Sequence, residues 1–177
     1  MRSGEFCVSL KANSANKDVR MRFLGNIEAK TDAKGRAFLP AQFRKVLSAS
    51  GEESLVLRQD VFEKILVIYP ESVWCAMMDE MRAKLSRWDR QQQMVYRTFV
   101  SSVINLAVDG NGRILIPKPF LQQAGIRQAI RFVGMGDTIE IWPNEPDDQQ
   151  PFMETTAFGQ ALEQLMSTDT PPTLNDD

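Results

Sequence analysis

Two aspartate and arginine pairs with the same spacing are the residues best suited to binding or chemistry. Asp32 precedes Arg36 by four positions, and Asp109 precedes Arg113 by four. A carboxylate can orient a guanidinium through a charge-assisted hydrogen bond. A guanidinium held in this way can bind phosphate or clasp the O6 and N7 atoms of guanine. The pairs therefore predict either a nucleic-acid-binding surface or two internally braced turns.

Each pair lies in a predicted turn that has a glycine directly before the arginine. Gly35 and Gly112 can adopt a positive φ. An aspartate that opens such a turn can accept hydrogen bonds from backbone N–H groups two residues on. We assign Asp32 and Asp109, with both glycines, to shaping the turns and orienting the arginines. Direct base contact by the aspartates is not expected, because a carboxylate repels phosphate.

Further cations lie close to these turns in the sequence. A single surface lysine is usually only solvated. As a group, however, cations around the two arginines could neutralise DNA phosphates. The predicted DNA-binding residues are Arg36, Arg113, Lys34, Arg44, Lys45 and Lys118.

The composition argues against an enzyme. The chain has no histidine, which is the side chain that most often transfers protons near neutral pH. Cys7 and Cys75 lack the Cys-x-x-Cys spacing of a zinc site. We therefore expect no catalytic residue, no metal and no cofactor. An aspartate-based hydrolase is the weaker alternative, because neither aspartate is followed by the Ser/Thr-Gly sequence of aspartic proteases.

The charge is distributed unevenly along the chain. The formal net charge is −2, yet residues 144–177 contain eight acidic side chains and no basic one. Residues 1–143 therefore carry 21 basic and 15 acidic side chains, a net charge of +6. A moderately basic body with an acidic tail is compatible with a nucleic-acid partner.

The elements that must position the arginines occur twice. Residues 32–43 align with 109–120 at an offset of 77, with Asp, Gly, Arg, Pro and Phe identical, and 66–70 align with 139–143 at an offset of 73. Each copy predicts a turn, a short strand, a proline that opens a short helix, and a closing strand pair. The strand pairs are expected at 54–58 with 65–69 and at 130–133 with 138–142.

The apolar spacing changes to a helical period between the copies. Val73 to Leu85 and Met94 to Val103 each place apolar residues on one helical face. A methionine-rich stripe of this kind is usually core packing, and we interpret it so. The expected organisation is an N-terminal extension or leader (1–20), module 1 (25–73), linker helices (74–101), module 2 (102–145), and a C-terminal helix with an acidic, disordered tail (146–177).

The duplicated pattern resembles the MraZ family over about residues 21–166, most specifically in the segment from Leu106 to Pro117. The resemblance implies an α+β, mainly β fold, in which two AbrB-like swapped-hairpin modules form a double-psi-like β-barrel. It further implies a cytoplasmic, nucleoid-associated regulator that assembles into a ring-like homo-oligomer. Its partner would be double-stranded DNA, at tandem promoter repeats of its own division and cell-wall gene cluster, with no membrane and no small-molecule substrate.

One position departs from the repeat. Leu121 stands in the second copy where Arg44 stands in the first. Counted by copy, residues 32–45 carry a net charge of +3 and residues 109–122 a net charge of +1. We therefore expect the first copy to supply more of the DNA-binding charge. An AbrB-like antitoxin remains an alternative function, although its single module would leave the duplication and the linker helices unexplained.

Overall fold

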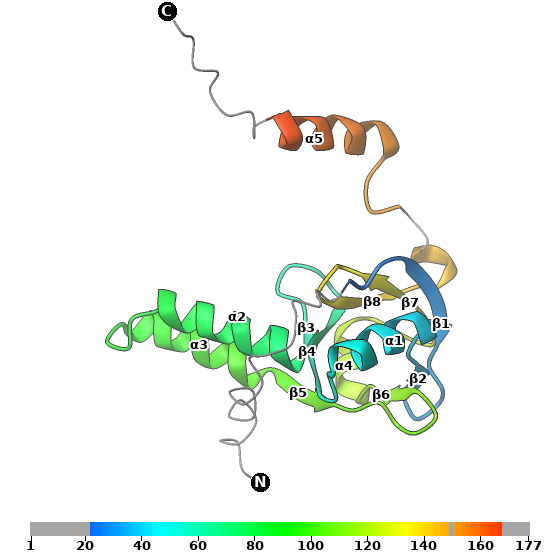
Figure 1. Ribbon diagram of the computed structural model, residues 1–177, viewed down its shortest axis with the longest axis horizontal. Coiled ribbons are helices and arrows are strands. Elements are labelled where there is room, and N and C mark those ends of the chain that lie inside the picture. The colour runs from blue at the N-terminus through cyan, green and yellow to red at the C-terminus, as the bar shows by residue number, and fades with distance from the viewer. Residues whose placement is uncertain (1–21, 149–150, 168–177) are drawn as a thin grey trace, which may run out of the picture. The chain divides into compact units, whose positions relative to one another are not determined.

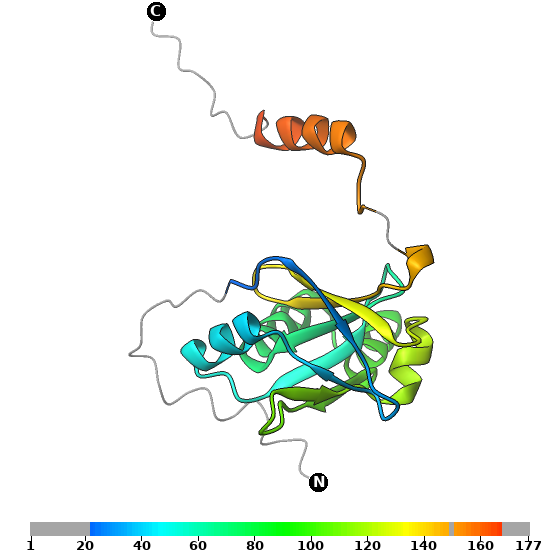
Figure 2. The same ribbon diagram turned by 90° about the vertical axis from the view of Figure 1, so that its right-hand side faces the viewer.

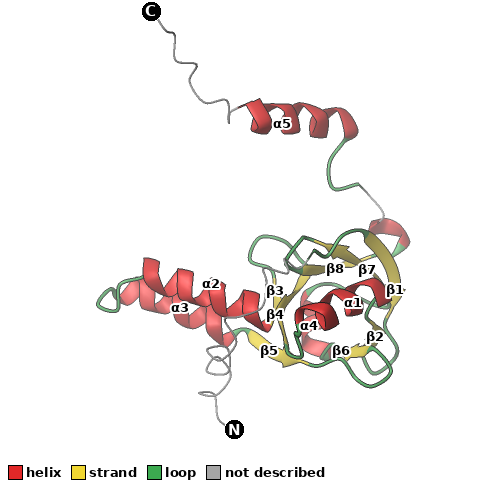
Figure 3. Cartoon of the chain, in the orientation of Figure 1, coloured by secondary structure: helices red, strands yellow, loops and turns green. Residues whose placement is uncertain are grey.

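The computed structural model describes residues 22–148 and 151–167 of the chain. These residues form an α+β structure with eight strands and five α-helices (Figure 3). One compact unit extends to Glu145, and the residues from Pro146 form a second unit. The predicted N-terminal extension and the acidic tail beyond residue 167 lie outside the described residues. No helix in the described part of the chain is long and apolar enough to cross a membrane.

The two copies contain the same elements in the same order. The first copy comprises β1 (Asn26–Lys30), β2 (Arg36–Phe38), α1 (Ala41–Ser50), β3 (Leu55–Gln59) and β4 (Leu66–Pro70). The second comprises β5 (Val103–Leu106), β6 (Arg113–Leu115), α4 (Lys118–Gln123), β7 (Ala129–Gly134) and β8 (Ile139–Pro143). Both predicted closing strand pairs are confirmed, since β3 pairs with β4 and β7 pairs with β8.

The short helices begin where the sequence predicts, and each ends before a glycine. Pro40 caps α1 and Pro117 caps α4, so each proline's missing N–H falls where no intrahelical partner exists. Gly51 follows α1 with φ of 70°, and Gly125 lies just beyond α4 with φ of 67°. This left-handed conformation is a common way to end a helix and suits glycine.

The strands of the two copies are interleaved. The six-stranded sheet has the order β1-β7-β8-β4-β3-β5, and β2 and β6 form a separate two-stranded sheet. The first strand of each copy thus pairs with the third strand of the other, as β1 with β7 and β5 with β3. Figures 1 and 2 show the strands of both copies side by side, with α1 and α4 on opposite sides of them in Figure 2. The six-strand order reads the same from either end when the copies are exchanged.

The prediction of a β-barrel is wrong in one respect: the strands of the described residues do not close into a barrel. The strands β1 and β5 are the two edges of the six-stranded sheet and do not pair with each other. The strands β2 and β6 are only three residues long and pair with one another, so neither bridges the open edges. The α+β class is confirmed, whereas the sheet remains open.

Both copies contribute to one apolar core. Its buried members come from every strand of the six-stranded sheet except β1, from β2 and β6, and from α1 and α4. Phe23 and Phe43 meet edge to face with ring centroids 5.6 Å apart. The centre of the small sheet joins the same core through Ala37 and Ile114, which are 2% and 1% exposed. The core therefore holds the inner face of β2 and β6 and leaves their outer face, with Arg36 and Arg113, toward the solvent.

Two antiparallel helices, α2 (Glu71–Lys84) and α3 (Arg90–Ser101), connect the copies and lie side by side (Figure 1). Trp74 stacks on Phe99 with centroids 5.2 Å apart, and the guanidinium of Arg58 lies 4.1 Å from the Phe99 centroid. The interpretation of the methionine stripe as core is confirmed only in part. Trp74 is buried and the stripe methionines of α2 are half-buried, whereas α3 buries no residue and Met94 is 56% exposed. Buried contact with the rest of the chain comes mainly from Trp74 and Cys75 of α2.

The second unit contains a 3-10 turn, Pro146–Asp148, and α5 (Thr155–Ser167). The predicted C-terminal helix is therefore present. Its apolar side chains are exposed within the described structure, among them Phe158, Leu162 and Leu165.

Candidate nucleic-acid interface

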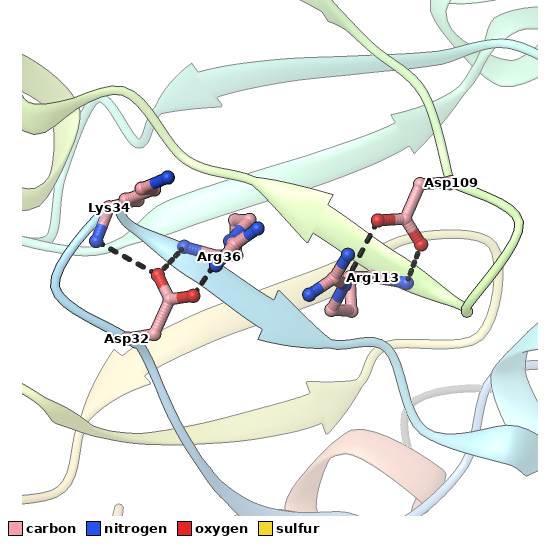
Figure 4. Close-up of polar contacts among 5 residues, drawn as sticks. All are labelled: Asp32, Lys34, Arg36, Asp109 and Arg113. Carbon is pink, nitrogen blue, oxygen red and sulfur yellow. Dashed lines mark hydrogen bonds and ion pairs between the residues drawn. The ribbon is translucent and has the colours of Figure 1, made fainter.

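Asp32 organises the turn that carries Arg36. One carboxylate oxygen, Oδ1, accepts hydrogen bonds from the backbone N–H groups of Lys34 and Arg36, each at 2.9 Å. The other, Oδ2, accepts from the Arg36 Nε at 2.7 Å (Figure 4). Gly35 has φ of 87°, the left-handed conformation that the turn requires. The guanidinium is thus oriented by the carboxylate of its own turn.

The second turn repeats this geometry. Asp109 Oδ1 accepts from the backbone N–H groups of Asn111 and Arg113, each at 2.9 Å, and Oδ2 accepts from the Arg113 Nε at 3.0 Å. Gly112 has φ of 80°. In each turn the backbone N–H of the arginine, aided by the bond from its guanidinium, lowers the pKa of the aspartate carboxyl. Both carboxylates are therefore ionised near neutral pH and already engaged.

This engagement argues against the hydrolase alternative. A general base needs a pKa near the working pH and a free oxygen within reach of the substrate. Each aspartate instead accepts three hydrogen bonds inside its own turn and has a lowered pKa. Among residues 22–148 and 151–167, no three His, Cys, Asp or Glu side chains are grouped to hold a metal ion.

The two turns lie at opposite ends of the β2 and β6 pair. Arg36 is opposite Leu115, and Phe38 is opposite Arg113. Figure 4 shows Arg36 and Arg113 on the two adjacent strands. Each turn is also bonded to the strand end of the other copy: the Leu39 N–H donates to the Gly112 carbonyl at 2.9 Å, and an equal bond links Ile116 N–H to the carbonyl of Gly35. The position of each arginine therefore depends on both copies.

Arg44 lies beside the turn of the second copy, although it belongs to the first. Its Nε donates to the Leu39 carbonyl at 3.1 Å. A Cβ added to Gly112 would lie 2.6 Å from the Arg44 Nη1. Leu121, at the matching position of α4, is 9% exposed, and its Cδ1 lies 3.4 Å from the point where Gly35 would carry a Cβ. Each helix thus covers the glycine of the other copy, with an arginine in one case and a leucine in the other.

The arginines of both copies line one open cleft of about 750 Å³. Its charged lining consists of four basic and two acidic side chains, Lys30, Arg36, Arg44, Arg113, Glu28 and Asp32. The structure therefore brings together Arg36, Arg44 and Arg113. The other predicted cations, Lys34, Lys45 and Lys118, are exposed but do not line this cleft.

Two residues of the cleft were missed by sequence reasoning. Lys30 ends β1 two positions before Asp32, and its counterpart in the second copy is Ala107, so the repeat comparison gave no signal. Phe38 also lines the cleft. The signal for Phe38 was its place two residues after Arg36 in a strand, because alternate residues of a strand share one face.

Comparison with known proteins identifies the family. The chain matches the family described as "MraZ protein, putative antitoxin-like" over residues 22–98 and 101–150. It is 55% identical over 148 residues to the "Transcriptional regulator MraZ" of Phocaeicola vulgatus, covering 84% of this chain and 96% of the relative. Relatives of the same name from Bacteroides fragilis (51% over 156 residues; 88% and 98% covered) and Anaeromyxobacter dehalogenans (36% over 135 residues; 76% and 93% covered) also match. On this evidence, the chain belongs to the MraZ family.

Proposed function

We propose that this chain is a transcriptional regulator that binds double-stranded DNA through the cleft and turns of β2 and β6. The observation that carries the proposal is the convergence of Arg36, Arg44 and Arg113, from both copies, on one open cleft. Cations gathered in this way attract phosphates and release condensed counterions on binding. The relatives named as transcriptional regulators support the same class of function.

The roles of the residues follow from their positions. Arg36 and Arg113 each donate through Nε to an aspartate, and the Nη groups of a guanidinium carry four further N–H donors for phosphate or guanine. Arg44 and Lys30 add positive charge within the cleft. The exposed lysines outside the cleft would contact phosphates further along the duplex; these are Lys34, Lys45 and Lys118.

The proposal extends to the assembly. The interleaved pairing of β1 with β7 and of β5 with β3 supports two duplicated swapped-hairpin modules, 25–73 and 102–145, separated by linker helices 74–101 and followed by a C-terminal segment 146–177. Several copies of the chain in a ring-like homo-oligomer would bind tandem promoter repeats at the same time. The assembly would be cytoplasmic and associated with the nucleoid. Linked weak contacts raise the overall affinity roughly 10²–10⁴-fold. The apolar side chains that α3 leaves exposed, such as Met94 and Val95, support such an assembly.

A salt titration of DNA binding tests the proposal. The probe is a duplex taken from the region upstream of the chain's own gene, with a shuffled duplex as reference. Affinity for B-DNA falls with salt at a logarithmic slope of about −0.9 per neutralised phosphate. Arg36→Ala and Arg113→Ala should each weaken binding and flatten the slope by about one unit. Arg87→Ala, an exposed arginine in the turn between α2 and α3, is the matched control and should bind as the wild type does.

Two outcomes would contradict the proposal. The first is no binding to either duplex at low salt by a folded oligomer. The second is a loss of thermal stability in Arg36→Ala and Arg113→Ala with an unchanged salt slope, which would mean that the arginines only brace their turns.

A further inference from the structure

The outer face of the β2 and β6 pair carries apolar side chains between the arginines. The inner pair, Ala37 and Ile114, is buried in the core. Because strand residues alternate between faces, the flanking residues of both strands share the outer face. There Phe38 is 62% exposed and Leu115 is 54% exposed. The protein thus exposes two large apolar side chains on the strands that carry Arg36 and Arg113.

The four outer residues form an alternating pattern. Phe38 lies opposite Arg113, and Leu115 lies opposite Arg36, so each cross-strand pair joins one cation and one apolar group. Phe38 and Leu115 are also the matching positions of the two copies, at the offset of 77 that relates the arginines. The apolar groups therefore recur with the same local symmetry as the cations.

A two-stranded antiparallel ribbon fits the major groove of B-DNA, which is about 12 Å wide. In that groove thymine is distinguished by its C5 methyl group, which apolar side chains contact, whereas guanine presents O6 and N7 to arginine. We propose that Phe38 and Leu115 read DNA sequence by contacting thymine methyl groups, next to the bases or phosphates bound by the arginines. This inference rests on the DNA binding proposed above and adds the chemistry by which the sequence is recognised.

Charge complementarity favours DNA over a protein partner on this face. A protein partner that covered Phe38 and Leu115 would also desolvate the two arginines and would need acidic groups between its apolar ones. The nearest carboxylates, Asp32 and Asp109, are already bonded within their own turns. DNA supplies apolar methyl groups and electronegative base atoms in the same groove, so it satisfies both kinds of side chain.

Replacement of thymine by deoxyuridine tests the proposal, because uracil lacks only the methyl group. The upstream duplex is prepared with thymine or with deoxyuridine throughout, and binding to both forms is measured for the full chain. Loss of one buried methyl contact weakens binding about fourfold, and loss of two weakens it roughly 15-fold. The wild type should therefore bind the thymine duplex about 4-fold to 15-fold more tightly than the deoxyuridine duplex.

The variant Phe38→Ala/Leu115→Ala separates side-chain contact from any change in DNA shape. It should bind the thymine duplex as weakly as the wild type binds the deoxyuridine duplex, and its preference between the two should fall to about one. Phe62→Ala, which removes a phenylalanine that is 91% exposed in the loop between β3 and β4, is the matched control and should keep the wild-type preference.

Three outcomes would overturn the inference and leave the proposed DNA binding untouched. Equal wild-type binding to both duplexes would remove methyl recognition and leave the proposed DNA binding intact. A preference that persists in the double variant would assign the effect to DNA shape. A changed oligomeric state of the double variant, with its thymine preference unaltered, would assign Phe38 and Leu115 to contact between copies. Absence of binding to both duplexes at low salt would instead refute the proposed function, and the inference with it.

Discussion

Arg44 lies over Gly112, so a side chain of the first copy completes the turn of the second. The close approach is possible because Gly112 has no Cβ, since an added one would lie 2.6 Å from the Arg44 Nη1. The turn of the first copy is covered instead by Leu121. The count of charges by copy therefore does not describe the two turns, because Arg44 adds its charge beside Arg113 of the other copy.

Replacement of Arg44 by leucine should make the two turns alike. Arg44→Leu keeps an apolar stem on α1 and removes the guanidinium from the cleft. We expect a salt slope of DNA binding flatter by about 0.9, as for one lost phosphate contact, with little change in melting temperature. Lys64→Ala, which removes an exposed lysine of the loop between β3 and β4 that has no place in the proposed interface, should leave the slope nearly unchanged. Equal effects of the two variants would remove the special role of Arg44.

The two turn glycines should differ in their tolerance of a methyl group. In Gly35→Ala the new Cβ would lie 2.3 Å from the Ile116 carbonyl oxygen, which is backbone and cannot move alone. In Gly112→Ala it would meet the flexible end of Arg44. Both residues have a positive φ, which costs about 1–2 kcal/mol for alanine. Urea unfolding should therefore show the larger loss of stability for Gly35→Ala.

Gly110→Ala provides the control for these variants. Gly110 lies in the second turn, and an added Cβ would meet nothing within 4 Å. Its substitution should leave the free energy of unfolding nearly unchanged. The same stability for Gly35→Ala and Gly112→Ala would show that Ile116 moves away as easily as the Arg44 side chain does.

The stability of the turns should fall in acid. Folding lowers the pKa of the Asp32 and Asp109 carboxyls below the usual 3.8, mainly because backbone N–H groups of the arginines bond to them. Their contribution is therefore fully present above the usual pKa and is lost as the pH falls through the folded value. Urea unfolding between pH 7 and pH 2 should show a smaller acid loss for Asp32→Asn/Asp109→Asn than for the wild type. Parallel pH profiles would contradict this assignment.

The helix pair should depend on the stacked aromatic side chains at its base. Trp74 is 3% exposed and stacks on Phe99. Trp74→Ala should lower the free energy of unfolding by about 3–5 kcal/mol, because it leaves a cavity between α2, α3 and the sheet. Trp88→Ala removes a side chain that is 97% exposed in the turn between the helices, and should change stability by less than about 0.5 kcal/mol. Similar losses for both tryptophans would show that the stacking contributes little.

The sequence alone determined the local features of the molecule. The structure has the bonded aspartate and arginine pairs, the left-handed glycines and the proline-capped helices that the repeat predicts. Each of these features depends on contacts between residues only a few positions apart. The two closing strand pairs were predictable for the same reason, since each joins strands that are neighbours in the chain.

The tertiary structure alone decided how the copies combine. Interleaved copies and separate copies have the same local sequence pattern, so the pairing of β1 with β7 and of β2 with β6 could not be derived from it. Strand partners far apart in the sequence are selected by burial in a shared core, to which both copies contribute. The resulting strand order leaves the sheet open, where a barrel was expected. It also places Arg44 beside the turn of the other copy, and Lys30 and Phe38 in the cleft with the arginines.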